Sequence, residues 1–136
     1  MTDISVTTTS HQTENRSWLL SQWGQGPGEN PSCVLDVSAF TKADHYPNGY
    51  FPSGLPVAVI AAASTGGKTV VGPFDPAAVD GSEVLGGFLH SSVKVPDSGA
   101  DPGGALVVCG FVKLSKLPVE VTAADVADAK LFHFTA

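Results

Sequence analysis

The residues that come closest to a nucleotide site are 62–69, Ala-Ala-Ser-Thr-Gly-Gly-Lys-Thr, which follow an apolar segment. They match the relaxed phosphate-loop pattern, with alanine in place of its first glycine. That chemistry needs a helix beginning at Lys68, because a helix N-terminus directs backbone N–H groups and a favourable dipole at the phosphates. Residues 70–73 read Val-Val-Gly-Pro instead, and β-branched residues, glycine and proline oppose a helix. The sequence therefore predicts a hairpin turn on residues 64–67 and no nucleotide site.

The side chains that bind metals most often are scattered along the chain. The histidines stand alone, without the short spacing of a metal-binding pair: His11, His45, His90 and His133. Asp75, Asp80 and Glu83 lack the ligand spacing of a calcium loop, and Asp80-Gly81 is typical of a turn. We therefore expect no metal site.

Nucleophilic catalysis also lacks a recognisable pattern in this chain. No Gly-x-Ser-x-Gly elbow occurs, and no histidine is near Cys33 or Cys109 in the sequence. Both cysteines stand in apolar, strand-like contexts, so we interpret them as small core residues rather than as a disulfide. The sequence predicts no catalytic residue and no cofactor, and we expect that the protein is not an enzyme.

The composition favours short strands joined by frequent turns. Of 136 residues, 15 are glycine and 10 are proline, and only 15% are charged, against roughly a quarter in an average soluble domain. The net charge is −6, and the lysines are too dispersed to form a basic stripe along a phosphate backbone. No apolar run approaches the ~20 residues of a membrane span. We expect one domain that binds neither nucleic acid nor membranes.

The hydrophobic pattern predicts a mainly β fold, a compact small barrel or sandwich-like domain over residues 33–136. Residues 33–40 alternate between apolar and polar, whereas residues 57–63 and 105–112 are apolar on both faces and are typical of central strands. Further strands are predicted in 68–74, 84–95 and 131–134. One short C-terminal helix is predicted over 122–130, with Thr122 as its N-cap.

The N-terminal quarter divides into an arm, an anchor and a linker. Residues 1–17 form an extended arm, in which Ile4, Val6 and Thr8 share one face of a possible strand. The alternation is too sparse to hold a strand alone, so the arm is either a frayed terminus or a strand that adds to a partner's sheet. Trp18 and Trp23 belong to an apolar anchor, and a Gly/Pro linker follows, so that the two together cover residues 18–32.

A second candidate contact region is the loop at residues 45–54, which combines two prolines with clustered aromatic residues. Its candidate interface residues are Tyr46, Asn48, Tyr50 and Phe51. A loop this apolar either packs over the open end of its own barrel or is buried in a subunit interface, where tyrosine and phenylalanine are enriched. The sequence leaves both alternatives open.

The chain resembles the head decoration proteins of tailed bacteriophages, also called capsid cementing or stabilisation proteins. The resemblance spans about residues 33–136 and rests on motifs at 41–54, 72–75, 80–83, 87–89, 93–96 and 110–118. In layout alone the chain is also similar to the lambdoid head decoration protein. It departs from the family by the Trp18 to Trp23 anchor and the glycine linker inserted after the arm.

The resemblance implies a compact β-rich homotrimer that has no enzyme activity and no cofactor. It implies binding to the major capsid protein at three-fold positions of the expanded capsid, with the arm reaching the capsid surface. The candidate capsid-binding residues of the arm and its anchor are Ile4, Val6, Thr8, Trp18 and Trp23. Such a protein is made in the host cytoplasm and ends on the outer surface of the virion. Two alternatives remain: a tail or baseplate β-module that binds other virion or host molecules, and a small β-barrel enzyme.

Overall fold

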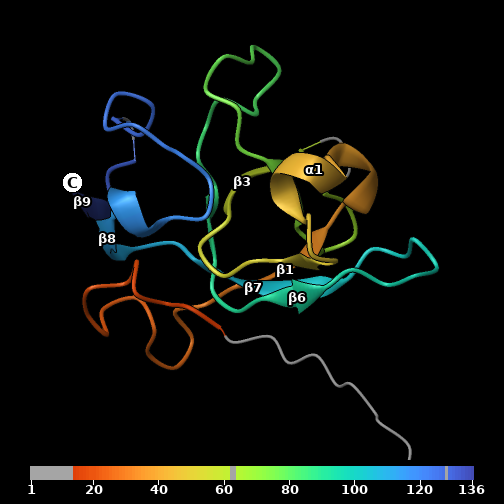
Figure 1. Cartoon of the computed structure of the whole chain (residues 1–136), viewed down its shortest axis with the longest axis horizontal. Helices are drawn as coiled ribbons and strands as arrows, with labels where there is room; N and C mark the ends of the chain where they lie inside the picture. The colour runs from red at the N-terminus through yellow and green to blue at the C-terminus, as the bar shows by residue number, and fades with distance from the viewer. Residues whose placement is uncertain (1–13, 62–63, 128) are drawn as a thin grey trace, which may run out of the picture.

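The main sheet of the molecule closes into a β-barrel (Figure 1). The computed structural model describes residues 14–61, 64–127 and 129–136. Within these residues, five strands close the barrel in the order β1-β4-β3-β5-β7. They are β1 Ser32–Leu35, β3 Pro56–Val59, β4 Val70–Pro73, β5 Gly87–Leu89 and β7 Gly103–Val107. The prediction of a mainly β fold built on a small barrel is confirmed.

The remaining elements are short and lie around the barrel. They are η1 Val37–Ala39, α1 Lys42–His45, β2 Tyr50–Phe51, β6 Val93–Lys94, β8 Gly110–Lys113, η2 Leu114–Lys116 and β9 Phe132–Thr135. In Figure 1, α1 lies at one end of the molecule, and β8 and β9 lie at the other. No helix in the described part of the chain is long and apolar enough to cross a bilayer.

Residues 64–69 belong to the connection of a β-hairpin, as predicted for 64–67. β3 and β4 pair antiparallel, with Val59 opposite Val71, and the Ile60 N–H donates to the Val70 carbonyl at 2.8 Å. The Ser64 hydroxyl donates to the Ile60 carbonyl at 2.7 Å and accepts from the Val70 N–H at 3.0 Å. β4 follows Lys68 at the position where a phosphate loop has a helix, so Lys68 does not stand at a helix N-terminus.

Two hydrophobic clusters share the walls formed by β5 and β7. Successive side chains of a strand point to opposite faces, so Leu89 and Leu106 enter the barrel core whereas Phe88 and Val107 enter a second cluster. The barrel core also contains Cys33, Leu35, Phe40, Phe51, Leu55, Val57 and Val71. The second cluster, called here the Trp18 cluster, is completed by Trp18 and Val112 and is flanked by Phe132 and Phe134.

A small sheet covers the Trp18 cluster from outside. β8 and β9 pair in parallel, with Phe111 opposite His133. On the other edge of β8, Leu19 forms an antiparallel bridge with Val112, and the Lys113 N–H donates to the Trp18 carbonyl at 2.8 Å. The anchor segment therefore extends this sheet, and the closing strand predicted at 131–134 is confirmed.

Several of the predicted strands are shorter than expected. The segment 84–95 contains two short strands, β5 and β6, which belong to different sheets, and the strand predicted over 57–63 ends at Val59. The strand predicted over 33–40 ends at Leu35, because the Asp36 carboxylate accepts from the Ser38 N–H at 3.2 Å and begins η1. The apolar run 105–112 is divided between β7 and β8, which belong to different sheets. The break falls at Val108 and Cys109, and β8 begins at Gly110, whose φ of +139° is one that residues with a side chain rarely adopt.

The C-terminal helix predicted over 122–130 is wrong. Its described residues form turns rather than a helix, although Thr122 makes the expected capping contacts. The Asp125 N–H donates to the Thr122 hydroxyl at 3.3 Å, and the Thr122 N–H donates to the Asp125 carboxylate at 3.0 Å. A single turn offers too few hydrogen bonds to propagate a helix, while Val121 and Val126 are both buried.

Candidate functional site

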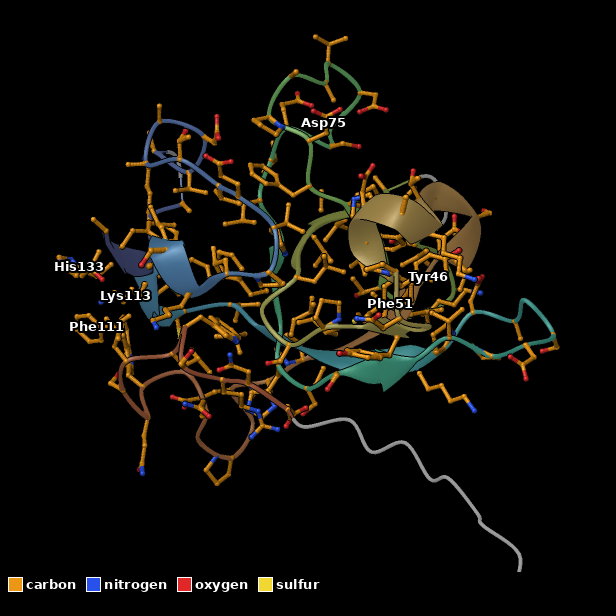
Figure 2. All side chains as sticks on the ribbon, in the orientation of Figure 1. Tyr46, Phe51, Asp75, Phe111, Lys113 and His133 are labelled. Carbon is orange, nitrogen blue, oxygen red and sulfur yellow. The ribbon has the colours of Figure 1, made fainter. Side chains whose placement is uncertain are left out.

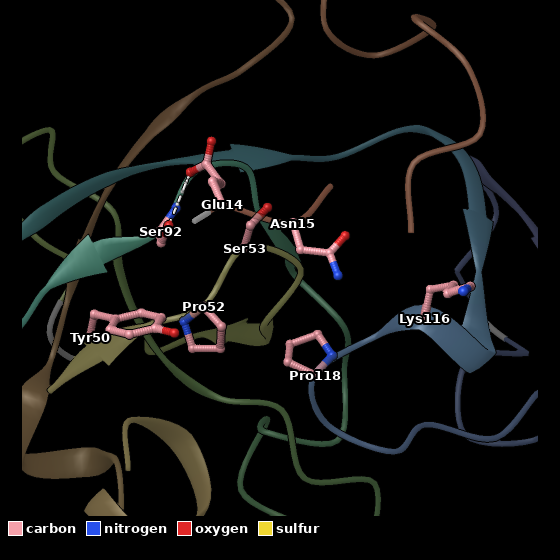
Figure 3. A pocket seen from close by; sticks show the side chains of 8 residues that line it. All are labelled: Glu14, Asn15, Tyr50, Pro52, Ser53, Ser92, Lys116 and Pro118. Carbon is pink, nitrogen blue, oxygen red and sulfur yellow. Dashed lines mark hydrogen bonds between the residues drawn. The ribbon is translucent and has the colours of Figure 1, made fainter. Parts of the chain in front are cut away.

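The N-terminal segment is fastened to the molecule at residues 14–17, called here the arm root. The Ser92 N–H and hydroxyl donate to the Glu14 carboxylate at 2.6 and 3.1 Å, as Figure 3 shows. Arg16 forms an ion pair with Glu14 and donates to the His90 carbonyl at 3.2 Å and to the Ser91 hydroxyl at 2.9 Å. These contacts attach the root to the connection between β5 and β6. Ile4, Val6 and Thr8 lie outside the described residues.

The titratable groups of the arm root influence one another. Burial lowers the pKa of His90 from its usual 6.5, and the Arg16 guanidinium lowers it further, against a smaller opposite effect of Glu14. Burial opposes ionisation of Glu14, but the bonds from Ser92 and the charge of Arg16 together offset it, so its pKa is below the usual 4.5. The root is therefore built for a charged carboxylate beside a neutral imidazole.

Acidification from pH 7 to about pH 4 is expected to destabilise the protein through the arm root. Below pH 6.5 the unfolded chain protonates His90 more readily than the folded chain does, so stability falls as the pH falls. The contribution of Glu14 is present above pH 4.5 and is lost as the pH falls through its lower folded-state pKa. Melting temperatures measured across this range test the expectation.

The variant Glu14→Gln is the matched control for this pH dependence. It removes the titrating carboxylate and retains a side chain of the same length, so the melting temperature should vary less below pH 4.5 than in the parent protein. Identical pH profiles for parent and variant would show that Glu14 does not couple the arm root to folding.

A small cleft joins the arm root to the predicted interface loop (Figure 3). Its volume is about 140 Å³, and it is lined by Glu14, Asn15, Tyr50, Pro52, Ser53, Ser92, Lys116 and Pro118. The Ser53 hydroxyl is already engaged, because it accepts from the Trp18 indole N–H at 3.1 Å and donates to the His90 carbonyl at 2.7 Å. Tyr50 and the arm root thus line the same cleft, and the Ser53 hydroxyl between them already makes two hydrogen bonds within the protein.

The interface loop divides into buried and accessible residues. Phe51 is fully buried, with its ring centroid 4.7 Å from that of Phe40 and 5.1 Å from that of Tyr46. The prediction that Phe51 contacts a neighbouring subunit is therefore wrong. At Phe51 the loop packs over its own barrel (Figure 2). Tyr46 is partly covered by the same packing, Tyr50 is half-buried, and Asn48 is exposed.

The two tryptophans of the anchor have different surroundings. Trp18 is fully buried, and its ring centroid is 5.5 Å from that of Phe88, so its surface is used inside the molecule rather than against a partner. Trp23 is 48% exposed and lies against Phe111, with ring centroids 5.7 Å apart. The linker also packs against the molecule: the Asn30 amide donates to the carbonyls of Gly24 at 2.8 Å and Leu106 at 3.0 Å.

Sequence reasoning missed an exposed aromatic face on the small sheet. The aromatic face is defined by Leu20, Trp23, Phe111, Leu131 and His133. The Phe111 ring centroid is 5.4 Å from that of His133, and Figure 2 shows both side chains at the edge of the molecule near Lys113. The alternation of residues 131–134, with Phe132 and Phe134 directed inward, carries the signal that could have revealed it.

The described residues show no arrangement suited to metal or thiol chemistry. Among them, no three histidine, cysteine or acidic side chains gather to hold a metal ion. Burial raises the pKa of the Cys33 thiol to about 11, against a smaller opposite effect of a hydrogen bond with the backbone of Gly104. Cys33 is therefore protonated at neutral pH, and a thiol in that state is a poor nucleophile.

Comparisons with protein families, with curated proteins and with solved structures found no match to this chain.

Proposed function

We propose that this protein is a head decoration protein of a tailed bacteriophage. It binds the outer surface of the expanded capsid as a trimer at three-fold positions and stabilises the contacts between major capsid subunits. The observation that carries this proposal is the set of motifs described above, above all residues 41–54. In the fold these residues form α1, a turn and β2 in a single unit, which the packing of Phe51 holds on the barrel.

The arm root supports the proposal because a tether needs a firm attachment. Glu14 and Arg16 are hydrogen-bonded to the β5–β6 connection, and Trp18 is buried in a hydrophobic cluster. A tension applied to residues before 14 is therefore transmitted to the barrel wall at β5. A protein that clamps neighbouring shell subunits requires this kind of connection between its contact segment and its folded part.

The composition of the arm indicates how it binds. Residues 2–10 are rich in threonine and serine, with Ile4 and Val6 as apolar positions of one face. So little apolar surface does not offset the backbone ordering entropy of about 1–2 kcal/mol per residue. Pairing of the main chain with a sheet edge of the shell supplies the missing hydrogen bonds, and Ile4 and Val6 then face the shell.

Co-sedimentation with purified expanded capsids tests this function. The full chain should pellet with the shells, whereas a variant that lacks residues 2–13 should remain largely in the supernatant. That deletion leaves Glu14, Arg16 and Trp18 in place, so its melting temperature should stay close to that of the full chain.

Three outcomes of this experiment decide between the possibilities. A full chain that never pellets with shells contradicts the decoration function, and its recovery with purified tails would support the tail or baseplate alternative. If the deletion variant decorates shells as tightly as the full chain, the arm is only a frayed terminus. A large loss of melting temperature in the variant would show that the arm belongs to the fold itself.

A further inference from the structure

The aromatic face combines exposed apolar side chains from three segments of the chain. In the described residues, seven large hydrophobic side chains are exposed, and four of these, Leu20, Trp23, Phe111 and Leu131, belong to this face. Their common direction follows from strand alternation, because the neighbours Leu19, Val112 and Phe132 point inward to the Trp18 cluster. A contiguous exposed apolar patch of this kind marks an interaction surface.

An apolar groove lies at the opposite end of the same strands. Its volume is about 400 Å³, and it is lined by Leu114, Ser115, Glu120, Val121, Ala123, Phe134, Thr135 and Ala136. Leu114 follows the last residue of β8, and Thr135 is the last residue of β9. By contrast, Leu131 precedes β9, and the Trp23 carbonyl lies against Gly110 at the start of β8. The projecting face and the groove thus lie at opposite ends of two parallel strands.

The charge distribution indicates which molecule approaches this end. After Cys109, Lys113, Lys116 and Lys130 balance Glu120, Asp125 and Asp128, so this segment carries no formal net charge. The whole net charge of −6 therefore belongs to residues 1–109. Residues 110–136 supply the whole groove and three of the five residues of the aromatic face, Phe111, Leu131 and His133. Two copies of this chain therefore meet less electrostatic repulsion through these surfaces than through the acidic remainder.

The ring geometry disfavours a small planar ligand on the aromatic face. The Trp23 and Phe111 planes are inclined by 55°, and the Phe111 and His133 planes by 64°. A sugar or a nucleic-acid base stacks on a flat ring surface, which this tilted series does not offer. An irregular apolar projection is better suited to insertion into a groove of another protein.

We propose that the aromatic face of one copy of this chain inserts into the β8–β9 groove of the next copy. The contact joins two different surfaces, and contacts of this type generate a closed ring when the rotation between copies permits closure. The inference deepens the homotrimer of the proposed function by naming the surfaces that join its subunits. It places Leu20, Trp23 and Leu131 of one subunit against Leu114, Val121 and Ala123 of its neighbour.

Analytical ultracentrifugation of single variants tests the contact from both sides. Leu131→Lys places a charge on the face, and Ala123→Arg fills the groove; both positions are exposed. Each variant should weaken self-association by about tenfold or more, which corresponds to about 1.4 kcal/mol or more. The matched control is Val79→Lys, because Val79 is 95% exposed and belongs to neither surface, so this variant should leave association unchanged.

Mixing the two variants gives the sharper result. The Leu131→Lys copy retains an open groove, and the Ala123→Arg copy retains an intact face, so the mixture should form a one-to-one dimer and nothing larger. A symmetric contact of face against face would leave Ala123→Arg fully associated, and that result overturns the proposal. A mixture that stays monomeric, or a parent protein that is monomeric at every concentration, overturns it as well.

Capsid co-sedimentation of the same proteins separates this inference from the proposed function. A parent protein that pellets with shells but never self-associates contradicts the interface and leaves the decoration function standing. A parent protein that self-associates through these surfaces but does not pellet with shells contradicts the decoration function and still supports the proposed interface.

Discussion

Replacement of Trp18 by alanine should lower the free energy of unfolding by about 3–5 kcal/mol, the range for removal of a large aromatic side chain from a core. Trp18 is fully buried against Phe88, and it contributes its indole N–H to the Ser53 hydroxyl at 3.1 Å. The truncation leaves a cavity between the barrel wall and the small sheet. Denaturant titration followed by circular dichroism measures the loss.

Two further variants separate packing from general effects of removing a tryptophan. Trp18→Phe keeps an aromatic ring and loses the hydrogen bond to Ser53, so its cost should be well below that of alanine. Trp23→Phe changes a residue that is 48% exposed and should be nearly neutral to stability. Equal losses at Trp18 and Trp23 would contradict the assignment of Trp18 as the internal anchor.

Replacement of Gly24 by alanine should destabilise the protein by several times the cost of the same change at Gly28. Both glycines have a left-handed backbone, with φ of +89° and +80°, which costs a residue with a side chain roughly 1–2 kcal/mol. A Cβ at Gly24 would lie 2.0 Å from the Cys109 carbonyl oxygen, whereas a Cβ at Gly28 meets nothing within 4 Å. The difference between the two variants therefore measures the close backbone approach alone.

Denaturant titration of the two glycine variants provides the measurement. Gly28→Ala should cost about 1 kcal/mol, and Gly24→Ala should cost more, because two backbone segments are forced apart. Loss of the contact should also raise the exposure of Trp23, which precedes Gly24, and shift its fluorescence to longer wavelength. If the two variants are equally stable, the linker does not dock on the β7–β8 connection as described.

The parts of the fold that the sequence predicts best are strands formed by short runs of apolar residues next to a turn. The predicted range 57–63 overlaps β3, and the range 68–74 contains β4, because valine-rich segments separated by a glycine turn favour a hairpin without help from distant residues. The division of 105–112 into β7 and β8 was not predictable in this way. It depends on Gly110, where the Trp23 carbonyl approaches so closely that a Cβ would lie 2.8 Å away, and sequence alone does not reveal that approach.

The candidate contact regions were predicted only where the contacting residues are neighbours in the sequence. The loop at 45–54 was recognised as a packed aromatic segment, but the sequence left open whether Phe51 faces its own barrel or a partner. That choice depends on Phe40, which joins Phe51 across a turn. The aromatic face was missed because its members come from three separated segments, and none of these segments is unusual by itself. Only the pairing of β8 with β9 and with the Trp18 segment assembles it.

The attachment of the arm root has a consequence for the order in which the chain folds. The hydrogen bond between Trp18 and Ser53 closes 35 residues of chain, and that between Arg16 and Ser91 closes 75. The β3–β4 hairpin closes only a short turn, so it loses far less chain entropy when it forms. We therefore expect the barrel to form before residues 14–20 attach to it. A partly folded molecule then has a complete barrel to which residues 14–20 are not yet attached, and the segment that we propose binds the shell is joined to the barrel only at the last step.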